Sequence, residues 1–268
     1  MTSVSKPGRR VEPYTRLADA YDIVHQAKPY DREARTIRSL ARRYARRPIR
    51  SVLDVACGSG GHLRPFSRWC TCTGVDASPT MLARARQRVP EARLELGRME
   101  SFDLGRQFDL VTCLFSAIGY VRSVPDLRRT LRNLARHTAP GGVVVVEPWI
   151  TPGQFLVGHV HHVLAKAGGT TVSRMNGAER RGNRSIFDFH YLVGRDGKVE
   201  HLVETHDLGL FDSRTMKAAF RAAGLEVRYV PGGLSTHRGL YLGRRPRADG
   251  EAGSGRASRG PLRSPAER

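Results

Sequence analysis

Asp54-Val55-Ala56-Cys57-Gly58-Ser59-Gly60 is the stretch of sequence that decides the fold. The apolar run that leads into it, Ser51 to Ala56, is typical of a buried strand, and helix-like sequence begins near Gly61 or His62. Glycine is needed in the turn because the backbone must bend tightly and let a ligand approach without a Cβ in the way. We therefore expect a ligand to lie against this turn.

Asp76 indicates what kind of ligand it is. This residue ends the next strand-like run, 16 residues after Gly60, where a carboxylate can accept hydrogen bonds from both hydroxyls of a ribose. A dinucleotide is not expected, because Leu63 stands where a GxGxxG motif has its third glycine. A P-loop is excluded because the Gly-Lys-Ser or Gly-Lys-Thr that it requires is absent. The sequence thus predicts a nucleoside site of another kind.

Strand-like and helix-like segments alternate through the first half of the chain. The expected strands are 51–56, 71–76, 94–96, 108–115 and 142–147, and helices are expected over 78–88 and 125–137. Ser78 is the expected N-cap of the first of these helices, with Pro79 at its first position. Because the strands are continuously apolar, the sheet should be parallel and covered on both faces. This pattern predicts a doubly wound, Rossmann-like α/β fold.

The pattern changes after Pro148. Residues 170–176, 184–194 and 198–211 alternate with period two, which is typical of antiparallel strands, and a helix (213–223) and a strand (225–231) follow. We expect a small antiparallel β insertion placed over one end of the main sheet. The predicted division is a disordered N-terminus (1–12), a cofactor-binding domain (13–148), a substrate-covering insertion (149–212), a segment that completes the main sheet (213–243) and a disordered basic tail (244–268).

The charge of the chain makes nucleic acid the first partner to consider. Among 268 residues, 45 Lys and Arg against 25 Asp and Glu give a formal net charge of +20. Residues 1–10 hold +3 of this and residues 244–268 hold +4, leaving +13 on residues 11–243. Eight arginines crowd residues 32–50, whose apolar positions follow a helical period. A solvated helix face is therefore the simpler interpretation.

Other classes of protein are disfavoured. No stretch approaches the roughly 18 to 20 continuous apolar residues of a membrane span, and residues 1–10 lack the apolar segment of a secretory signal, so we expect a cytoplasmic protein with no membrane partner. The four cysteines include no CxxC pair. His159, His161 and His162 have no acid or cysteine nearby to complete a ligand set, so no metal is predicted.

The glycine-rich stretch, Asp-x-Ala-Cys-Gly-Ser-Gly, resembles motif I of the class I S-adenosylmethionine-dependent methyltransferases. Supporting segments follow in the family's order: Gly97-Arg98-Met99, Phe108 to Val111, and Pro140 to Gly142. The resemblance implies that S-adenosylmethionine binds at the loop, that S-adenosylhomocysteine is the product and that Asp76 holds the ribose. Arg98 stands where relatives often have an acid, and arginine has no acceptor. Adenine should then be read by backbone groups of Arg98 and Met99.

A narrower resemblance covers residues 14–243. Methyltransferases of nucleic-acid amino groups carry Asn-Pro-Pro-Tyr or Asp-Pro-Pro-Tyr after the fourth strand, whereas this chain has Leu114 to Tyr120 (LFSAIGY). That segment, together with 143–149, 169–174, His190-Tyr191 and 232–240, is similar to the N,N-dimethyltransferases of TDP-linked amino deoxysugars, of the desosamine and mycaminose type. The segments indicate a small-molecule enzyme.

This resemblance implies roles for individual residues. Tyr14 and Tyr120 are the expected catalytic residues beside the acceptor amine, and some relatives have His in place of Tyr120. The expected cofactor-binding residues are Tyr21, Lys28, Asp54, Ala56, Gly58, Gly60, Asp76, Met81, Arg98, Met99 and Leu114. The expected substrate-binding residues are Tyr14, Ser116, Glu147, Trp149, Arg174, His190 and Arg238. Glu147 and Trp149 should face the sugar, and the two arginines suit a diphosphate because guanidinium groups donate in bidentate form.

Alternatives stay open at this point. Tyr14 and Tyr21 fall in a candidate helix over 14–24, where their spacing of seven also fits a core stripe, and Asp54 also fits a structural role in holding the loop. The leading hypothesis is an N-methyltransferase of a nucleotide-linked amino deoxysugar in natural-product biosynthesis. The runner-up is an N- or O-methyltransferase of another small molecule, and a nucleic-acid-binding protein is third. Under the leading hypothesis the expected partner of this protein is a nucleotide sugar and not nucleic acid. A homodimer is left open.

Overall fold

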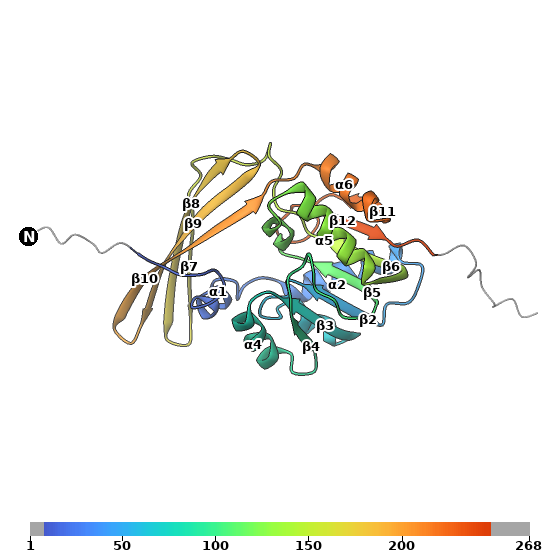
Figure 1. The fold of residues 1–268 in the computed structure, drawn as a ribbon. Coiled ribbons are helices and arrows are strands. Elements are labelled where there is room, and N and C mark those ends of the chain that lie inside the picture. Colours follow the sequence, from blue (N-terminus) through green and yellow to red (C-terminus); the bar gives the residue numbers. More distant parts are fainter. Residues whose placement is uncertain (1–7, 248–268) are drawn as a thin grey trace, which may run out of the picture.

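A seven-stranded sheet forms the centre of the larger of two layered parts of the protein (Figure 1). The structure is a computed structural model that describes residues 8–247. The strand order is β11-β12-β6-β5-β2-β3-β4, with bounds Glu226–Val230, Leu240–Arg244, Thr138–Val146, Phe108–Cys113, Ser51–Val55, Thr71–Asp76 and Arg93–Leu96. Strands β6, β5, β2, β3 and β4 are parallel, and β12 and β11 complete the sheet as an antiparallel pair.

Helices cover both faces of this sheet. Helices α2 (Tyr30–Tyr44) and α3 (Leu63–Ser67) pack on one face with Val143 and Val145 of β6, whereas α5 (Val124–Arg136) and α6 (Ser213–Ala222) pack on the other with Val144 and Val146. Because alternate residues of β6 point to opposite covered faces, the strand is apolar at every position. The doubly wound α/β prediction is confirmed.

Helix α4 (Pro79–Arg88) begins where the sequence predicts. The Ser78 side chain accepts a hydrogen bond from the backbone N–H of Met81, and Pro79 occupies the first helical position. This cap is a local feature of four residues, so the sequence alone specifies it.

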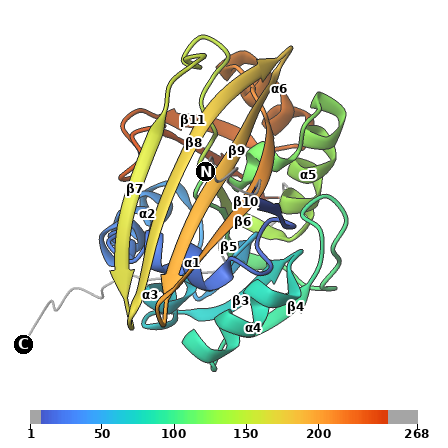
Figure 2. The ribbon, with the colours of Figure 1, turned by 90° about the vertical axis from the view of Figure 1, so that its left-hand side faces the viewer.

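A second sheet stands in front of one side of the α/β part (Figures 1 and 2). Its order is β1-β10-β9-β8-β7, with bounds Arg9–Arg10, Lys198–Gly209, Arg184–Arg195, Thr170–Arg181 and His161–Ala167. Strands β8, β9 and β10 have 12 residues each, so β8 is longer than the predicted segment 170–176 and β10 is shorter than the predicted segment 198–211. Strand β7 was not predicted, because it lies at the sheet edge and exposes several of its side chains.

Helix α1 (Ala18–Val24) joins the two parts. Leu17 and Ala20 pack on Tyr191 and Leu202 of the second sheet, while Asp22 accepts a hydrogen bond of 2.6 Å from Ser59 in the glycine loop. The predicted helix over 14–24 is wrong at its start. Tyr14 lies in a turn with φ 60°, because tertiary contacts hold that turn out of the helix.

The predicted disorder at both ends is wrong for the residues that the structure describes. Arg9 and Arg10 form β1 and pair in parallel with Leu202 and Val203. Arg10 also donates 2.7 Å to Thr205 and pairs with Asp188. At the other end Arg244 lies in β12, and the guanidinium of Arg245 donates 2.7 Å to the carbonyl of Thr138. Residues 1–7 and 248–268 lie outside the described residues.

Within residues 8–247, no helix is both long enough and apolar enough to cross a membrane. Across the same range, no group of three or more His, Cys, Asp or Glu side chains is placed to hold a metal ion.

Candidate functional site

The glycine loop between β2 and α3 is held open by Asp76 at the carboxyl end of β3. One carboxylate oxygen of Asp76 accepts a hydrogen bond of 2.7 Å from the Gly58 N–H, and the other accepts 2.8 Å from the Ser78 N–H. Ala56, Gly58 and Gly60 all have positive φ, at 58°, 56° and 80°, a region that glycine enters freely and alanine does not. Burial raises the pKa of Asp76, and the backbone N–H donors oppose that rise.

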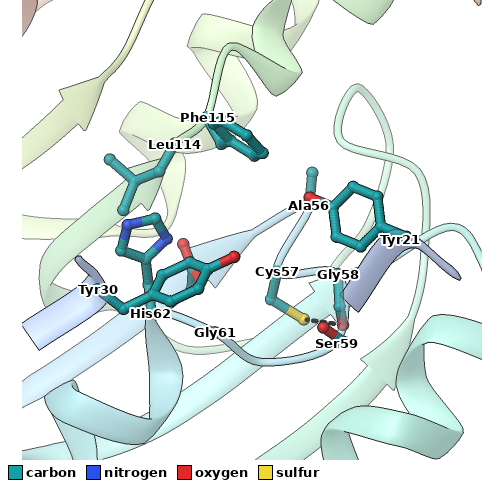
Figure 3. Close-up of a pocket in the computed structure, with 11 residues that line it drawn as sticks. Tyr21, Tyr30, Ala56, Cys57, Gly58, Ser59, Gly61, His62, Leu114 and Phe115 are labelled. Carbon is teal, nitrogen blue, oxygen red and sulfur yellow. Dashed lines mark hydrogen bonds between the residues drawn. The ribbon is translucent and has the colours of Figure 1, made fainter. Parts of the chain in front are cut away.

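A small cavity lies against this loop (Figure 3). The cavity is lined by Tyr21, Tyr30, Asp54, Ala56, Cys57, Gly58, Ser59, Gly61, His62, Leu114 and Phe115. In Figure 3 the rings of Tyr21, Tyr30 and Phe115 surround a space whose floor is the glycine loop. Apolar rings with a few polar groups, beside a strand-end carboxylate, fit S-adenosylmethionine.

The structure brings together five of the predicted cofactor residues as cavity lining: Tyr21, Asp54, Ala56, Gly58 and Leu114. Three others support the loop from behind. Asp76 accepts from Gly58, and ideal Cβ atoms on Gly58 and Gly60 would lie 3.4 Å from Met81 and from Ala85 of α4. The φ of 80° is what favours glycine at position 60, because a Cβ there would meet α4 at an ordinary contact distance.

Asp54 also ties β2 to β5. Its carboxylate is buried and accepts a hydrogen bond of 2.6 Å from the Thr112 hydroxyl. Burial raises the pKa of Asp54 to about 6. The same side chain lines the cavity, so its structural and ligand-facing roles are compatible.

Three predicted cofactor residues lie elsewhere. Lys28 does not line the cavity: its ammonium pairs with Glu33 at 2.7 Å and lies 4.4 Å from the centre of the Phe115 ring. The Arg98 guanidinium is exposed and pairs with Glu100 at 2.6 Å. Met99 packs against the apolar core, and its carbonyl accepts 3.2 Å from Asn133.

Glu33 is the centre of a buried polar cluster behind the cavity. It accepts hydrogen bonds from Lys28 and from the backbone N–H and hydroxyl of Ser235, and it bonds His62 at 2.8 Å. Burial alone would raise the pKa of Glu33, but the hydrogen bonds from His62, Lys28 and Ser235 outweigh it and lower the pKa to about 2. The cluster joins α2, the loop side of α3 and the 232–239 segment.

The hydroxyls of Tyr14 and Tyr120 are in direct contact, with 2.5 Å between the oxygens. Tyr120 lies in the short 3-10 helix η1 (Ala117–Tyr120) that follows β5. Its hydroxyl is also 2.5 Å from Nδ1 of His206, whose Nε2 is 3.2 Å from a carboxylate oxygen of Glu204. The ring of Tyr14 lies next to the ring of Tyr21, which lines the cavity, with 5.6 Å between the two ring centroids.

His206 and Glu204 were missed by the sequence reasoning. Both are buried on the inner face of β10, next to Leu202 and Leu208 on alternate positions. Two ionisable residues on the apolar face of a predicted strand were the signal that could have found them, because buried polar groups need partners.

A second group of predicted residues gathers around Trp149. The Arg238 guanidinium carbon lies 4.2 Å from the centre of a Trp149 ring, and Arg238 donates 2.7 Å to the Ser116 hydroxyl. The indole N–H of Trp149 donates 2.9 Å to Ser185. Burial lowers the pKa of Arg238, which the charge of Glu147 opposes.

Arg174 lies on the inner face of β8, opposite Tyr191 of β9. Its guanidinium carbon is 4.7 Å from the centre of the Phe189 ring, and its buried Nε is without a hydrogen-bond partner among the described residues. Burial, together with the charges of Arg174 and Lys28, lowers the pKa of His25 to about 4. A donor without a partner in this setting suits an anionic ligand.

Two predicted substrate residues are corrected by the structure. Glu147 is completely buried, and its oxygens accept from the Phe115 N–H at 2.6 Å and from the Thr236 hydroxyl, so it braces two loops and does not face a sugar. His190 is exposed on the outer face of β9 and bonds His201 at 3.1 Å. Because neighbouring Tyr191 points inward, strand alternation turns His190 away from the cavity.

Residues 52–142 match the family model described as "Methyltransferase domain". A relative from Streptomyces fradiae, the dTDP-3-amino-3,6-dideoxy-alpha-D-glucopyranose N,N-dimethyltransferase, is 45% identical over 88% of this chain and 92% of its own length.

Two solved structures are similar to this one. The crystal structure of DesVI from Streptomyces venezuelae has a TM-score of 0.81 and 39% identity, covering 87% of this chain and 99% of its own. CalS10, an amino pentose methyltransferase from Micromonospora echinaspora involved in calicheamicin biosynthesis, was solved with S-adenosylmethionine bound. It has a TM-score of 0.77 and 36% identity, covering 87% of this chain and 98% of its own.

Proposed function

Since the chain belongs to the family of nucleotide-amino-sugar N,N-dimethyltransferases, which are S-adenosylmethionine-dependent N-methyltransferases, we propose that it methylates the amino group of a TDP-linked amino deoxysugar. The observation that carries the proposal is that paired tyrosine hydroxyls lie next to Tyr21 of the cofactor cavity and that a stacked arginine bonds Ser116, which follows Phe115 of the cavity lining. The first would serve the amine and the second the diphosphate. The product would enter antibiotic biosynthesis, as it does for relatives of this kind.

S-adenosylmethionine supplies an electrophilic methyl group on a positively charged sulfur. The residues of this chain then have to hold a neutral amine in line with that methyl group, because placement at near-contact distance does most of the work for a good nucleophile and a good leaving group. Tyr14 and Tyr120 offer hydroxyl oxygens that accept from the amine N–H and turn its lone pair toward the methyl group.

Arg238 and Arg174 are the proposed diphosphate residues. Both guanidinium groups lie against aromatic rings, Arg238 on Trp149 and Arg174 on Phe189, and stacking holds a planar group ready to donate in bidentate form. Ser116 accepts a hydrogen bond from Arg238, and the charge of Arg174 acts on His25.

We propose a small anion and not nucleic acid as the partner, because relatives that cover most of this chain act on dTDP-linked amino sugars. Part of the basic charge is neutralised within the fold, as in the pairs of Arg84 and Arg88 with Asp22 and of Arg68 with Asp31. The four free cysteines also fit a reducing compartment, so we place the enzyme in the cytoplasm.

A second copy of the chain is the proposed occupant of the outer face of the second sheet. Leu164, Met175, Leu192 and Val199 are exposed together there, by 46% to 70%, which is unusual for a surface without a partner. A two-fold contact would bury this patch against itself. Light scattering should report a dimer that Leu192→Glu dissociates, while a monomeric wild type would refute the contact.

The function is tested by incubating the full chain with S-adenosylmethionine and a panel of TDP-3-amino and TDP-4-amino deoxysugars. Mass spectrometry should show the gain of one or two methyl groups on at least one of them. The isomer that reacts identifies the position of the amine. No gain on any member of the panel would contradict the proposal and favour another small-molecule acceptor.

A further inference from the structure

Resting on the proposed function, we infer that His206, held by Glu204, takes up the proton that the acceptor amine releases, with the Tyr120 hydroxyl as the bridge between them. The inference stands on a continuous chain of contacts from Tyr14 through Tyr120 and His206 to Glu204. It adds two residues of β10 to the site, and both act through Tyr120 and not on the substrate directly.

The direction of the hydrogen bonds follows from Glu204. A carboxylate only accepts hydrogen bonds, so Nε2 of His206 carries the proton and donates it to Glu204. Nδ1 of the neutral ring is then the acceptor and receives the Tyr120 hydroxyl. The Tyr120 oxygen can in turn accept from Tyr14. All donors thus point toward Glu204, and a second lone pair of the Tyr120 oxygen is left for an amine N–H.

Glu204 also positions Tyr14, the first residue in this series of hydrogen bonds. Its second carboxylate oxygen accepts a hydrogen bond of 3.2 Å from the backbone N–H of Tyr14. Tyr14 has φ 60°, a conformation that costs free energy for any residue but glycine. The same carboxylate therefore sets the imidazole tautomer and holds the turn that brings the Tyr14 hydroxyl to Tyr120.

The reaction needs a proton acceptor because an alkylamine is mostly protonated at neutral pH, with a pKa of about 10 for the ammonium of lysine. The ammonium must lose a proton before its lone pair can form a bond to carbon. When the N–C bond forms, the C–S bond breaks and its electrons stay on sulfur. The nitrogen becomes positive again, so a proton must also leave before a second methyl group can be added.

The proton moves in one relay. The amine gives its proton to the Tyr120 oxygen as the Tyr120 hydroxyl gives its own to Nδ1 of His206. Tyr120 stays neutral throughout, and His206 becomes an imidazolium beside the Glu204 carboxylate. The imidazolium returns the proton to water when the products exchange, so one proton is released for each methyl group transferred.

The tyrosines themselves are poor bases for this task. Burial raises the pKa of both Tyr14 and Tyr120, so neither hydroxyl ionises readily. The titratable groups in contact with His206 are Tyr120 from η1, Tyr14 from the turn before α1 and Glu204 on its own strand. Glu204 is the one carboxyl group among them, and a carboxylate next to an imidazolium stabilises it by its opposite charge.

The decisive variant is His206→Gln. The glutamine amide can accept from Tyr120 and donate to Glu204, but it cannot take up a proton. With the TDP-amino sugar that the wild type methylates, kcat at pH 7 should fall about 100-fold, within the usual range for a lost proton acceptor. KM and the affinity for S-adenosylhomocysteine should stay unchanged, and the deficit should shrink as rising pH deprotonates the amine in solution.

His159→Gln is the matched control, since His159 is exposed outside the two sheets, and it should keep the wild-type kcat and pH profile. A His206→Gln enzyme with the wild-type pH profile would overturn the inference and leave the proposed function intact. A wild type that methylates no amino sugar of the panel would instead overturn the proposed function, and this inference with it.

A second measurement does not depend on turnover or on the variant folding. Nitrogen-15 correlation spectra of the wild-type protein distinguish the two imidazole tautomers. His206 should show a protonated Nε2 and an unprotonated Nδ1, and Glu204→Gln should disturb this tautomer because an amide can also donate. A protonated Nδ1 in the wild type would contradict the relay, because Tyr120 would then have no acceptor for its proton.

Discussion

Arg238 stacks on Trp149, with its guanidinium carbon 4.2 Å from the centre of the indole ring. The arginine comes from the loop between β11 and β12, whereas the tryptophan follows β6, so the contact joins two segments 89 positions apart in the sequence. The indole is itself fixed by Ser185 of β9. A charged group held in this way loses little side-chain entropy when it binds an anion.

Replacing Arg238 should therefore weaken the binding of the sugar nucleotide and leave the cofactor unaffected. A charge-assisted hydrogen bond contributes about 1.5 to 3 kcal/mol, so Arg238→Ala should raise KM for the TDP-sugar roughly 10- to 100-fold. The KM of Arg238→Lys should lie between those of the wild type and of Arg238→Ala, because lysine keeps the charge but not the planar donor pair. Steady-state kinetics measure this, with Arg128→Ala, exposed on α5, as the control. An unchanged KM in Arg238→Ala would indicate that the diphosphate binds elsewhere.

Asp76→Asn should weaken cofactor binding. The carboxylate accepts from the backbone N–H groups of Gly58 and Ser78, and an amide keeps one accepting oxygen and turns a donor toward the other N–H. Loss of one charge-assisted bond predicts a dissociation constant for S-adenosylhomocysteine that is about 10-fold higher or more, measured by calorimetry. Asp196→Asn, in the β9–β10 turn at φ 51°, should bind normally because asparagine tolerates that conformation.

How much of the molecule follows from its sequence depends on how local each signal is. The Ser78 cap of α4 and the apolar run of β6 lie within short segments, and both were predicted. The start of α1 was not, because the φ 60° turn at Tyr14 is held by Glu204, which is 190 positions away. A tertiary hydrogen bond of that kind overrides the local helical pattern.

The residues of the site also differ in how local their sequence signals are. Glycine spacing and the strand-end acid indicate from sequence alone Asp54 and Gly58, which line the cavity, and Asp76, which holds the Gly58 N–H behind it. The resemblance led to Tyr14 and Tyr120, but the contact between Tyr120 and His206 is formed between η1 and β10 and has no sequence spacing to reveal it. Glu147 and His190 were assigned wrongly, because a segment's similarity does not say which face of a strand a side chain occupies.

Glu33 should make the stability of the fold depend on pH below the neutral range. Its pKa is lowered from the ordinary value of 4.5 to about 2, so the unfolded chain binds the proton first. The stability that Glu33 contributes is then complete above about pH 4.5 and is lost as pH falls toward 2. Glu33→Gln should flatten the curve of unfolding free energy against pH in that window, by at most ~1.4 kcal/mol per pH unit.

Chemical denaturation at a series of pH values measures this slope. Glu179→Gln is the control, because Glu179 pairs with Arg181 in an exposed hairpin where ion pairs contribute little. A wild-type slope in Glu33→Gln would mean that other acids dominate the acid unfolding.

Gly58→Ala and Gly105→Ala separate backbone strain from loss of the cofactor site. Both glycines have positive φ, 56° and 61°, so an alanine at either position should cost about 1 kcal/mol of stability. A Cβ at Gly105 would have no atom within 4 Å. A Cβ at Gly58 would contact Met81, and the neighbouring Gly58 N–H donates a hydrogen bond to Asp76. The two variants should therefore show similar decreases in Tm. Only Gly58→Ala should bind S-adenosylhomocysteine more weakly, by 10-fold or more. Equal affinity in the two variants would show that the loop binds its ligand without the close approach that glycine permits.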